Sequence, residues 1–117
     1  MKFARRWAYT VKGVPDNKAS VIFAKGNFWG RGLAACGASD DPARYGKFGP
    51  FNGLNFDMIE FNNVKALEER LASDPNTAAF MIEPIQGEKG KSTKSTQQQN
   101  NCPKHSQMEK GAELPFF

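Results

Sequence analysis

The stretch "TAAFMIE", residues 77–83, constrains the fold more than any other part of the sequence. Every residue between Thr77 and Glu83 is apolar. A continuous apolar run of this kind is typical of a strand buried on both faces, as strands are in parallel sheets that helices cover on both sides. Pro84 follows at once, and it ends a strand because it has no backbone N–H to donate. The run therefore favours an α/β fold with a parallel sheet.

Two further segments have the composition of strands. The segment "ASVIFAK", residues 19–25, is apolar and rich in β-branched side chains, and Gly26 ends it. The segment "FDMIEF", residues 56–61, alternates between apolar and polar residues. We predict a strand at each of these two segments.

Helical patterns separate these strands. Phe3 and Trp7 stand four residues apart, which predicts an amphipathic helix that Gly13 and Pro15 terminate. The segment "RGLAACG", residues 31–37, predicts a short helix with small side chains.

A third helix follows the strand at 56–61. Asn63 can cap it, and its apolar residues recur at helical spacing on one face, at Val64, Leu67 and Leu71. Residues 38–55 are dense in Gly, Pro, Asn and Asp, which predicts a long ordered loop without a helix or strand. The expected order is helix, strand, helix, loop, strand, helix, strand, with right-handed crossovers.

The composition changes near Gly90. Residues 89–117 carry five lysines against two glutamates, so +3 of the net charge of +4 lies there, and few of these residues are apolar. Such a segment buries too little surface to offset the entropy lost on ordering. We therefore predict a folded domain over residues 1–90 and a polar, disordered tail over residues 91–117.

The remaining totals exclude several classes of protein. A chain of 117 residues has room for one small domain, and no apolar run approaches the length that crosses a membrane. Two cysteines, Cys36 and Cys102, are too few for a disulfide framework and suggest a reducing compartment. The first residues lack the apolar core of a secretory signal. We expect no membrane association and no nucleic-acid partner, since single lysines scattered among Gln, Ser and Thr usually only keep a segment soluble.

Two motifs in the tail resemble ligand sites but do not meet their requirements. A phosphate-binding loop needs four residues between its glycines, whereas only two separate Gly87 from Gly90 in "GEKGKST". Cys102 and His105 have a spacing that zinc could use, but two ligands do not make a closed tetrahedral site. We therefore expect neither nucleotide nor metal binding.

The segment "GNFWGR", residues 26–31, has a composition suited to a ligand. Phe28 and Trp29 offer flat apolar faces for a planar ring, and Arg31 offers a planar fork that grips a carboxylate in two bonds. The alternative is that both aromatic side chains belong to the core and Arg31 is an ordinary surface residue. Glu83 and Glu88 follow the strand at 77–83, at the edge where ligands gather in open α/β sheets, or else are solvated loop carboxylates.

Several segments together resemble a known enzyme family. The segments "KFARRWAYTVKG", "VIFAKGNFWGR", "KFGPFNG", "FDMIEFNN" and "AAFMIEPIQGE" are similar, in this order over residues 2–90, to the ornithine aminotransferases. These are class III pyridoxal-phosphate enzymes of fold type I. The resemblance implies a partial large domain with a parallel sheet, a homo-oligomeric parent, and a location in the cytoplasm or the mitochondrial matrix.

The resemblance also implies roles for single residues. Phe28 would stack on the pyridine ring of pyridoxal phosphate, and Glu83 would lie beside this cofactor. Trp29 would wall the substrate pocket, and Arg31 would hold the substrate carboxylate distant from the reacting amine. Glu88 would cover a second arginine during the ornithine half-reaction and release it for glutamate. The substrates of the parent enzyme would be ornithine and 2-oxoglutarate.

The same resemblance limits what the chain is expected to do alone. In the family, the catalytic lysine, the aspartate that pairs with the pyridine nitrogen and the arginine partner of Glu88 all lie beyond the matched segments. After Gly90 the family continues with an apolar strand, whereas this chain has a polar tail, so we expect a truncated or misjoined product that is inactive by itself. The alternative is a non-enzymatic interaction fragment that binds the parent subunit or another protein.

Overall fold

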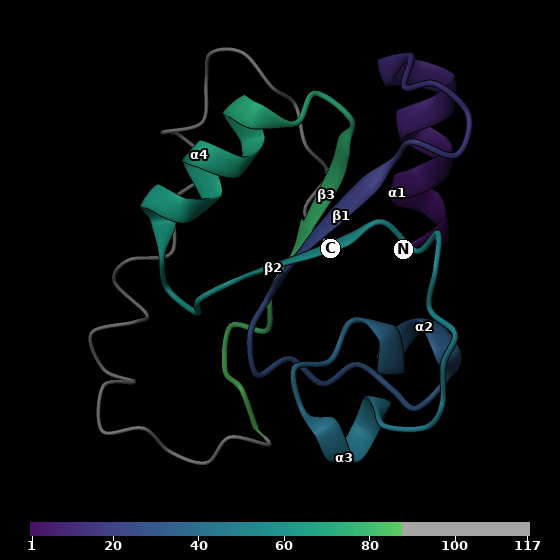
Figure 1. Ribbon diagram of the computed structural model, residues 1–117. Coiled ribbons are helices and arrows are strands. Elements are labelled where there is room, and N and C mark those ends of the chain that lie inside the picture. Colours follow the sequence, from purple (N-terminus) through teal and green to yellow (C-terminus); the bar gives the residue numbers. More distant parts are fainter. Residues whose placement is uncertain (88–117) are drawn as a thin grey trace.

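The computed structural model describes residues 1–87 (Figure 1). In chain order the elements are α1 (Lys2–Trp7), η1 (Ala8–Lys12), β1 (Ser20–Ala24), α2 (Leu33–Gly37), α3 (Pro42–Tyr45), β2 (Phe56–Ile59), α4 (Val64–Ser73) and β3 (Thr77–Met81). The predictions on Glu88, on the tail and on the Cys102 and His105 pair lie outside the described residues, as does most of "GEKGKST".

The three strands form one parallel sheet in the order β2-β1-β3. Val21 of β1 aligns with Phe56 of β2 on one side and with Ala79 of β3 on the other. The first strand of the sequence is thus the central one, and β1 is almost completely buried. This sheet confirms the α/β class and the parallel pairing expected from the apolar run at 77–83.

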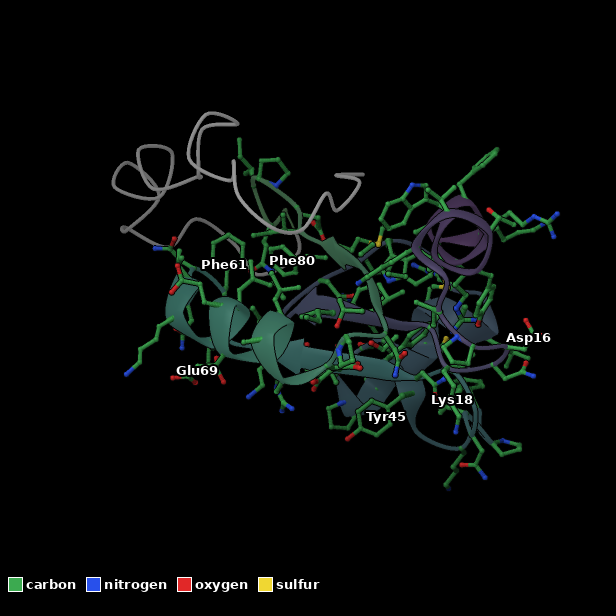
Figure 2. The ribbon with its side chains drawn as sticks, turned by 90° about the horizontal axis from the view of Figure 1, so that it is seen from above. Asp16, Lys18, Tyr45, Phe61, Glu69 and Phe80 are labelled. Carbon is green, nitrogen blue, oxygen red and sulfur yellow. The ribbon has the colours of Figure 1, made fainter. Side chains whose placement is uncertain are left out.

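Helices cover both faces of the sheet. Phe23 and Val21 of β1 face a core cluster that contains Ala4 of α1 and Ala8 of η1. Ile22 faces the opposite way. It packs with two side chains from β2 and α4, Ile59 and Leu67. Figure 2 shows the sheet from above, between α4 on one side and α1 on the other. Alternate residues of one strand therefore fill two separate cores.

The small residues of β3 let it lie close under α1. Ala78 and Ala79 are both buried in the cluster on the α1 side, where a register shift interrupts the pairing of β1 with β3 at Ser20 and Val21. An extra residue in one strand turns two successive side chains to the same face. Ala78 and Ala79 of β3 thus belong to the same core cluster as Ala4 of α1.

Two helix ends follow the expected local chemistry. Gly13 ends η1 with a φ of 77°, in the left-handed region that glycine adopts without strain. The side chain of Asn63 caps α4 by accepting a hydrogen bond from the backbone N–H of Ala66 at 3.0 Å. Of the apolar face predicted for α4, Leu67 is buried, Leu71 is half-buried and Val64 is exposed. The helix therefore packs mainly through its middle turn.

The segment 38–55 is more regular than predicted. It contains the short helix α3, which begins at Pro42 and is capped by Asp41, whose carboxylate accepts from the backbone N–H of Ala43 at 2.9 Å. An acidic cap followed by proline at the first helical position is a recognised start signal. The expectation of a loop without any element was wrong over these four residues.

None of the helices within residues 1–87 is long and apolar enough to cross a membrane.

Candidate functional site

The segment "GNFWGR" forms a bend at the carboxyl end of β1. Because β1 is the central strand of a parallel sheet, this bend lies at the edge where the strands β2 and β3 also end. Gly26 and Gly30 have positive φ angles of 77° and 139°, which the bend requires and which side chains rarely adopt. Ligands in open α/β sheets bind at this edge.

The start of the bend is held from the segment that joins α2 to α3. The backbone N–H of Gly26 donates to Oδ1 of Asp40 at 2.9 Å. The side-chain amide of Asn27 is buried and donates to the carbonyls of Ala24 at 3.0 Å and Ala38 at 2.7 Å. Buried amide groups that are fully bonded in this way fix the backbone around them. The bend is therefore an ordered part of the fold.

The same bend is held from the chain that follows β3. The backbone N–H of Phe28 donates a hydrogen bond to the carboxylate of Glu83. The side-chain amide of Gln86 donates to the carbonyl of Lys25 at 2.7 Å. Glu83 is half-buried and has a defined partner, so the interpretation of this residue as a solvated loop carboxylate was wrong.

The ring of Phe28 has a cation on one face. The guanidinium carbon of Arg44, from α3, lies 4.5 Å from the ring centroid. Nε of Arg44 also lies 3.3 Å from Oδ2 of Asp41, the residue that caps the same helix. The 4.5 Å between the guanidinium carbon and the ring centroid is within the range in which a guanidinium is attracted to an aromatic face. Arg44 therefore occupies one face of the half-buried Phe28 ring.

Trp29 turns toward the core. Its ring stacks on Phe23 of β1, with centroids 5.7 Å apart and planes 11° from parallel. The ring N–H of Trp29 is buried and has no hydrogen-bond partner among the described residues. Part of the alternative interpretation, in which the aromatic pair belongs to the core, is thus confirmed for Trp29. Its predicted role toward a substrate stays a prediction.

Arg31 ends the bend with an exposed side chain. Its backbone carbonyl lies 3.4 Å from the sulfur of Cys36 in α2. Within residues 1–87 no carboxylate forms an ion pair with the guanidinium of Arg31. The fork predicted to hold a carboxylate is therefore presented to solvent at the edge of the sheet.

A lysine stands directly before the bend and is paired. The ammonium of Lys25 forms an ion pair with Glu60, which follows β2. The hydrogen bond that Lys25 donates to Glu60, and then the negative charge of Glu60, raise the pKa of Lys25 above its ordinary value. Lys25 therefore stays protonated at neutral pH.

The structure brings together some of the predicted site residues and adds others. Phe28 and Glu83 are in direct contact, Trp29 and Arg31 share the bend, and Glu88 lies outside the described part of the chain. Sequence patterns missed the residues that hold the bend, which are Asn27, Asp40, Arg44 and Gln86. Gln86 lies in the quoted motif "EPIQGE" and could have been suspected, whereas nothing marks Arg44 within its irregular segment. No group of metal-binding side chains occurs in residues 1–87.

Comparison with known proteins gives a consistent family. The model of the family "Aminotransferase class-III" matches residues 1–105. The mitochondrial ornithine aminotransferases of Drosophila ananassae and Rattus norvegicus are each 57% identical over 89 residues. In both comparisons the match covers 76% of this chain and 20% of the relative. The chain therefore spans about a fifth of the length of these curated relatives.

Solved structures agree with the sequence relatives. The ornithine aminotransferase of Toxoplasma gondii ME49 superposes with a TM-score of 0.71 and 42% identity, over 85% of this chain and 24% of that protein. An acetylornithine aminotransferase from Elizabethkingia anophelis gives a TM-score of 0.53 and 30% identity, over 98% of this chain and 23% of that protein. The sheet and its helices are thus similar to part of these larger chains.

Proposed function

This chain belongs to the class-III aminotransferases, and from that premise we propose that it supplies part of the cofactor-binding domain of an ornithine aminotransferase. The complete enzyme would transfer the terminal amino group of ornithine to 2-oxoglutarate, giving glutamate semialdehyde and glutamate. One observation carries the proposal. An aromatic ring and an exposed guanidinium, Phe28 and Arg31, lie on one fixed bend at the carboxyl edge of the sheet, where ligands bind in open α/β folds.

The residues of the bend fit pyridoxal phosphate. Phe28 has one ring face backed by Arg44, which leaves one face for a single planar ring such as pyridine. Glu83 keeps the backbone of Phe28 in place beside that position. When bound, pyridoxal phosphate acts as an electron sink that makes the exchange of amino groups possible. The chain itself contributes the stacking surface and its support.

Arg31 suits the two substrates for a chemical reason. Ornithine reacts at its terminal amine and glutamate at its α-amine, so each presents a carboxylate at the end away from the reacting carbon. A planar guanidinium binds a carboxylate through two parallel hydrogen bonds. One exposed fork can therefore serve both half-reactions. Trp29 would form the neighbouring wall, and Glu88 would pair with an arginine supplied from outside this chain during the ornithine half-reaction.

The 117-residue chain is proposed to be inactive alone. It spans about a fifth of its curated relatives, whereas transamination needs a covalently held cofactor and groups on both sides of it. From its resemblance to the ornithine aminotransferases, the complete enzyme is proposed to be a homo-oligomer in the cytoplasm or the mitochondrial matrix. The animal relatives named above are described as mitochondrial.

A graft tests the proposal. The 89 matched residues of the Drosophila ananassae protein are replaced by those of this chain, and glutamate formation from ornithine and 2-oxoglutarate is measured. We expect the graft to retain turnover comparable with the unmodified relative, because the bend supplies equivalent groups. The 117-residue chain, assayed with added pyridoxal phosphate, serves as a matched control and should give no turnover. A folded graft that binds the cofactor but does not turn over would contradict the proposal.

A second candidate function is supported by the edges of the sheet. Within the described residues, β2 and β3 each pair on one side only, with β1. Unpaired strand edges are templates for association with another chain. In this second candidate the segment binds a full-length ornithine aminotransferase subunit without catalysing a reaction. Co-purification of the tagged chain with that subunit would support it, and separate elution of the two proteins would contradict it.

A further inference from the structure

We propose that Glu83 and Arg44 are positioning residues that together set the ring of Phe28 before any ligand binds. This inference rests on the proposed function, because it concerns the stacking surface offered to pyridoxal phosphate. Neither residue needs to touch the cofactor. Glu83 acts on the backbone of Phe28, and Arg44 acts on its ring.

Glu83 fixes the backbone of Phe28 across the sheet. Glu83 follows β3 and Phe28 follows β1, 55 residues apart in sequence, and the two strands are neighbours. A hydrogen bond from a backbone N–H to a carboxylate is stronger than one between neutral groups. Since the bond involves the amide of Phe28 itself, it fixes the residue that carries the ring.

Arg44 fixes the ring from a third segment. The guanidinium lies over one face of Phe28, and the carboxylate of Asp41 pairs with the same guanidinium. Asp41 also caps α3, so the cation stands on a short helix whose start is held by the same residue. Backing one ring face with a held cation restricts rotation of the ring and reserves the other face for a ligand.

The two contacts together favour binding by preorganisation. A ring held at its backbone and at one face loses little further freedom when a second ring stacks on it, and the cost of ordering side chains is a main cost of binding. A rival possibility is that Arg44 stands where the ligand ring would bind. The two possibilities predict opposite changes in the affinity for the ligand when the guanidinium is removed.

The first experiment measures amide hydrogen exchange in the full 117-residue chain. We expect Glu83→Leu to accelerate exchange of the Phe28 amide by about tenfold or more, since a charged hydrogen bond is lost, and Glu83→Gln to restore much of the protection. The Gly26 amide, which is bonded to Asp40, is the internal reference and should not change. Glu60→Leu removes an exposed carboxylate near the same bend and is the matched control. Unchanged exchange at Phe28, or equal acceleration at Gly26 and Phe28, would overturn the role of Glu83.

The second experiment tests the contact of Arg44. Ring-current shifts of the Arg44 side-chain protons should be present in the full chain and absent in Phe28→Leu. Pyridoxamine phosphate is then titrated while the Phe28 amide resonance is followed. We expect Arg44→Met to weaken binding about tenfold and Arg44→Lys to weaken it less, because lysine keeps the charge. Tighter binding in Arg44→Met, or absent ring-current shifts, would overturn the role of Arg44.

The two experiments separate the inference from the function on which it rests. One outcome is that the unsubstituted chain shows protected Phe28 exchange and ring-current shifts but no saturable response to pyridoxamine phosphate. In that case the positioning role of Glu83 and Arg44 stands and the proposed cofactor site fails. If pyridoxamine phosphate binds but the Phe28 amide is unprotected and the ring-current shifts are absent, the positioning role of Glu83 and Arg44 fails and the proposed site stands.

Discussion

The backbone around Phe28 is held by side chains from three segments, two of which are distant from it in sequence. Asp40, Glu83 and the buried Asn27 each complete one hydrogen bond or more at the bend, and the three belong to different segments. Each such bond contributes only about 0.5–3 kcal/mol, depending on its charge. Together, these hydrogen bonds restrict the backbone of the bend to one conformation.

Asp74 gives a prediction on the acid stability of the chain. Burial raises the pKa of Asp74. Hydrogen bonds from Ser20 and from the backbone of Asn76, the charge of Lys12 and a side-chain hydrogen bond with Thr77 together lower this pKa by more, so the net pKa lies below the ordinary 3.8. A depressed pKa means that the carboxylate stabilises the fold above 3.8 and loses this contribution as the pH falls through the lower folded value.

The test uses urea unfolding of the 117-residue chain. We expect the free energy of unfolding to fall more steeply between about pH 5 and about pH 2 in the unsubstituted chain than in Asp74→Asn, which cannot titrate. Asp16→Asn, at an exposed position, is the control. Identical acid profiles for the chain and Asp74→Asn would contradict the assignment.

At the scale of single residues, the sequence suggested which side chains the bend carries for a ligand, but it could not give their contacts. Phe28 and Trp29 are adjacent and similar in character, so composition cannot say which one packs on Phe23. Gly26 and Gly30, on either side of this pair, have positive φ angles that set the path of the backbone there. The pairing of Glu83 with Phe28 follows from parallel neighbouring strands, whereas the contact of Arg44 with Phe28 depends on the path of an irregular segment.

Among the elements, α3 is the one that carries Arg44, and its end is tightly packed. A Cβ added at Gly46 would lie 2.6 Å from the backbone oxygen of Pro42, a contact that backbone atoms cannot relieve. We expect Gly46→Ala to destabilise the chain by about 1–3 kcal/mol. Gly32→Ala is the matched control, since nothing lies within 4 Å of its Cβ. Urea unfolding measures both, and an equal effect of the two substitutions would count against this packing.

The helix α4 depends on its cap. Asn63→Ala removes the bond to the backbone N–H of Ala66, and we expect a loss of about 1 kcal/mol. Glu68→Ala, at an exposed position in the same helix, should be close to neutral. Thermal unfolding monitored by circular dichroism is the measurement. A neutral Asn63→Ala would show that another group replaces the cap.

Most elements were predictable, including the short helix expected within residues 31–37 and observed as α2, whereas α3 was not. The strand expected at 19–25 is observed at Ser20–Ala24, and the helix expected after Asn63 is observed at Val64–Ser73. Each has enough residues for its pattern to stand out. The helix α3 has four residues and is specified by a cap and a proline, so no periodicity could reveal it.

At the scale of the whole molecule, the order of the segments brings the residues of the proposed site together. A parallel sheet brings the ends of β1 and β3 to one edge, so "GNFWGR" and "EPIQGE" meet although they lie far apart in the chain. Exposed apolar side chains remain at Phe3, which is 82% exposed, and at Ile85, which is 72% exposed. Together with coverage of about a fifth of the relatives, these features fit a segment of a larger aminotransferase.

The most direct measurement is the kinetics of Arg31 variants in the grafted enzyme. We expect Arg31→Met to raise KM for both ornithine and 2-oxoglutarate by about 30-fold or more, since two charged hydrogen bonds are lost, while the content of pyridoxal phosphate is unchanged. Arg31→Lys should recover part of this loss, and Arg6→Met, exposed on α1, is the control. A graft in which Arg31→Met binds both substrates as well as the unsubstituted form does would contradict the account.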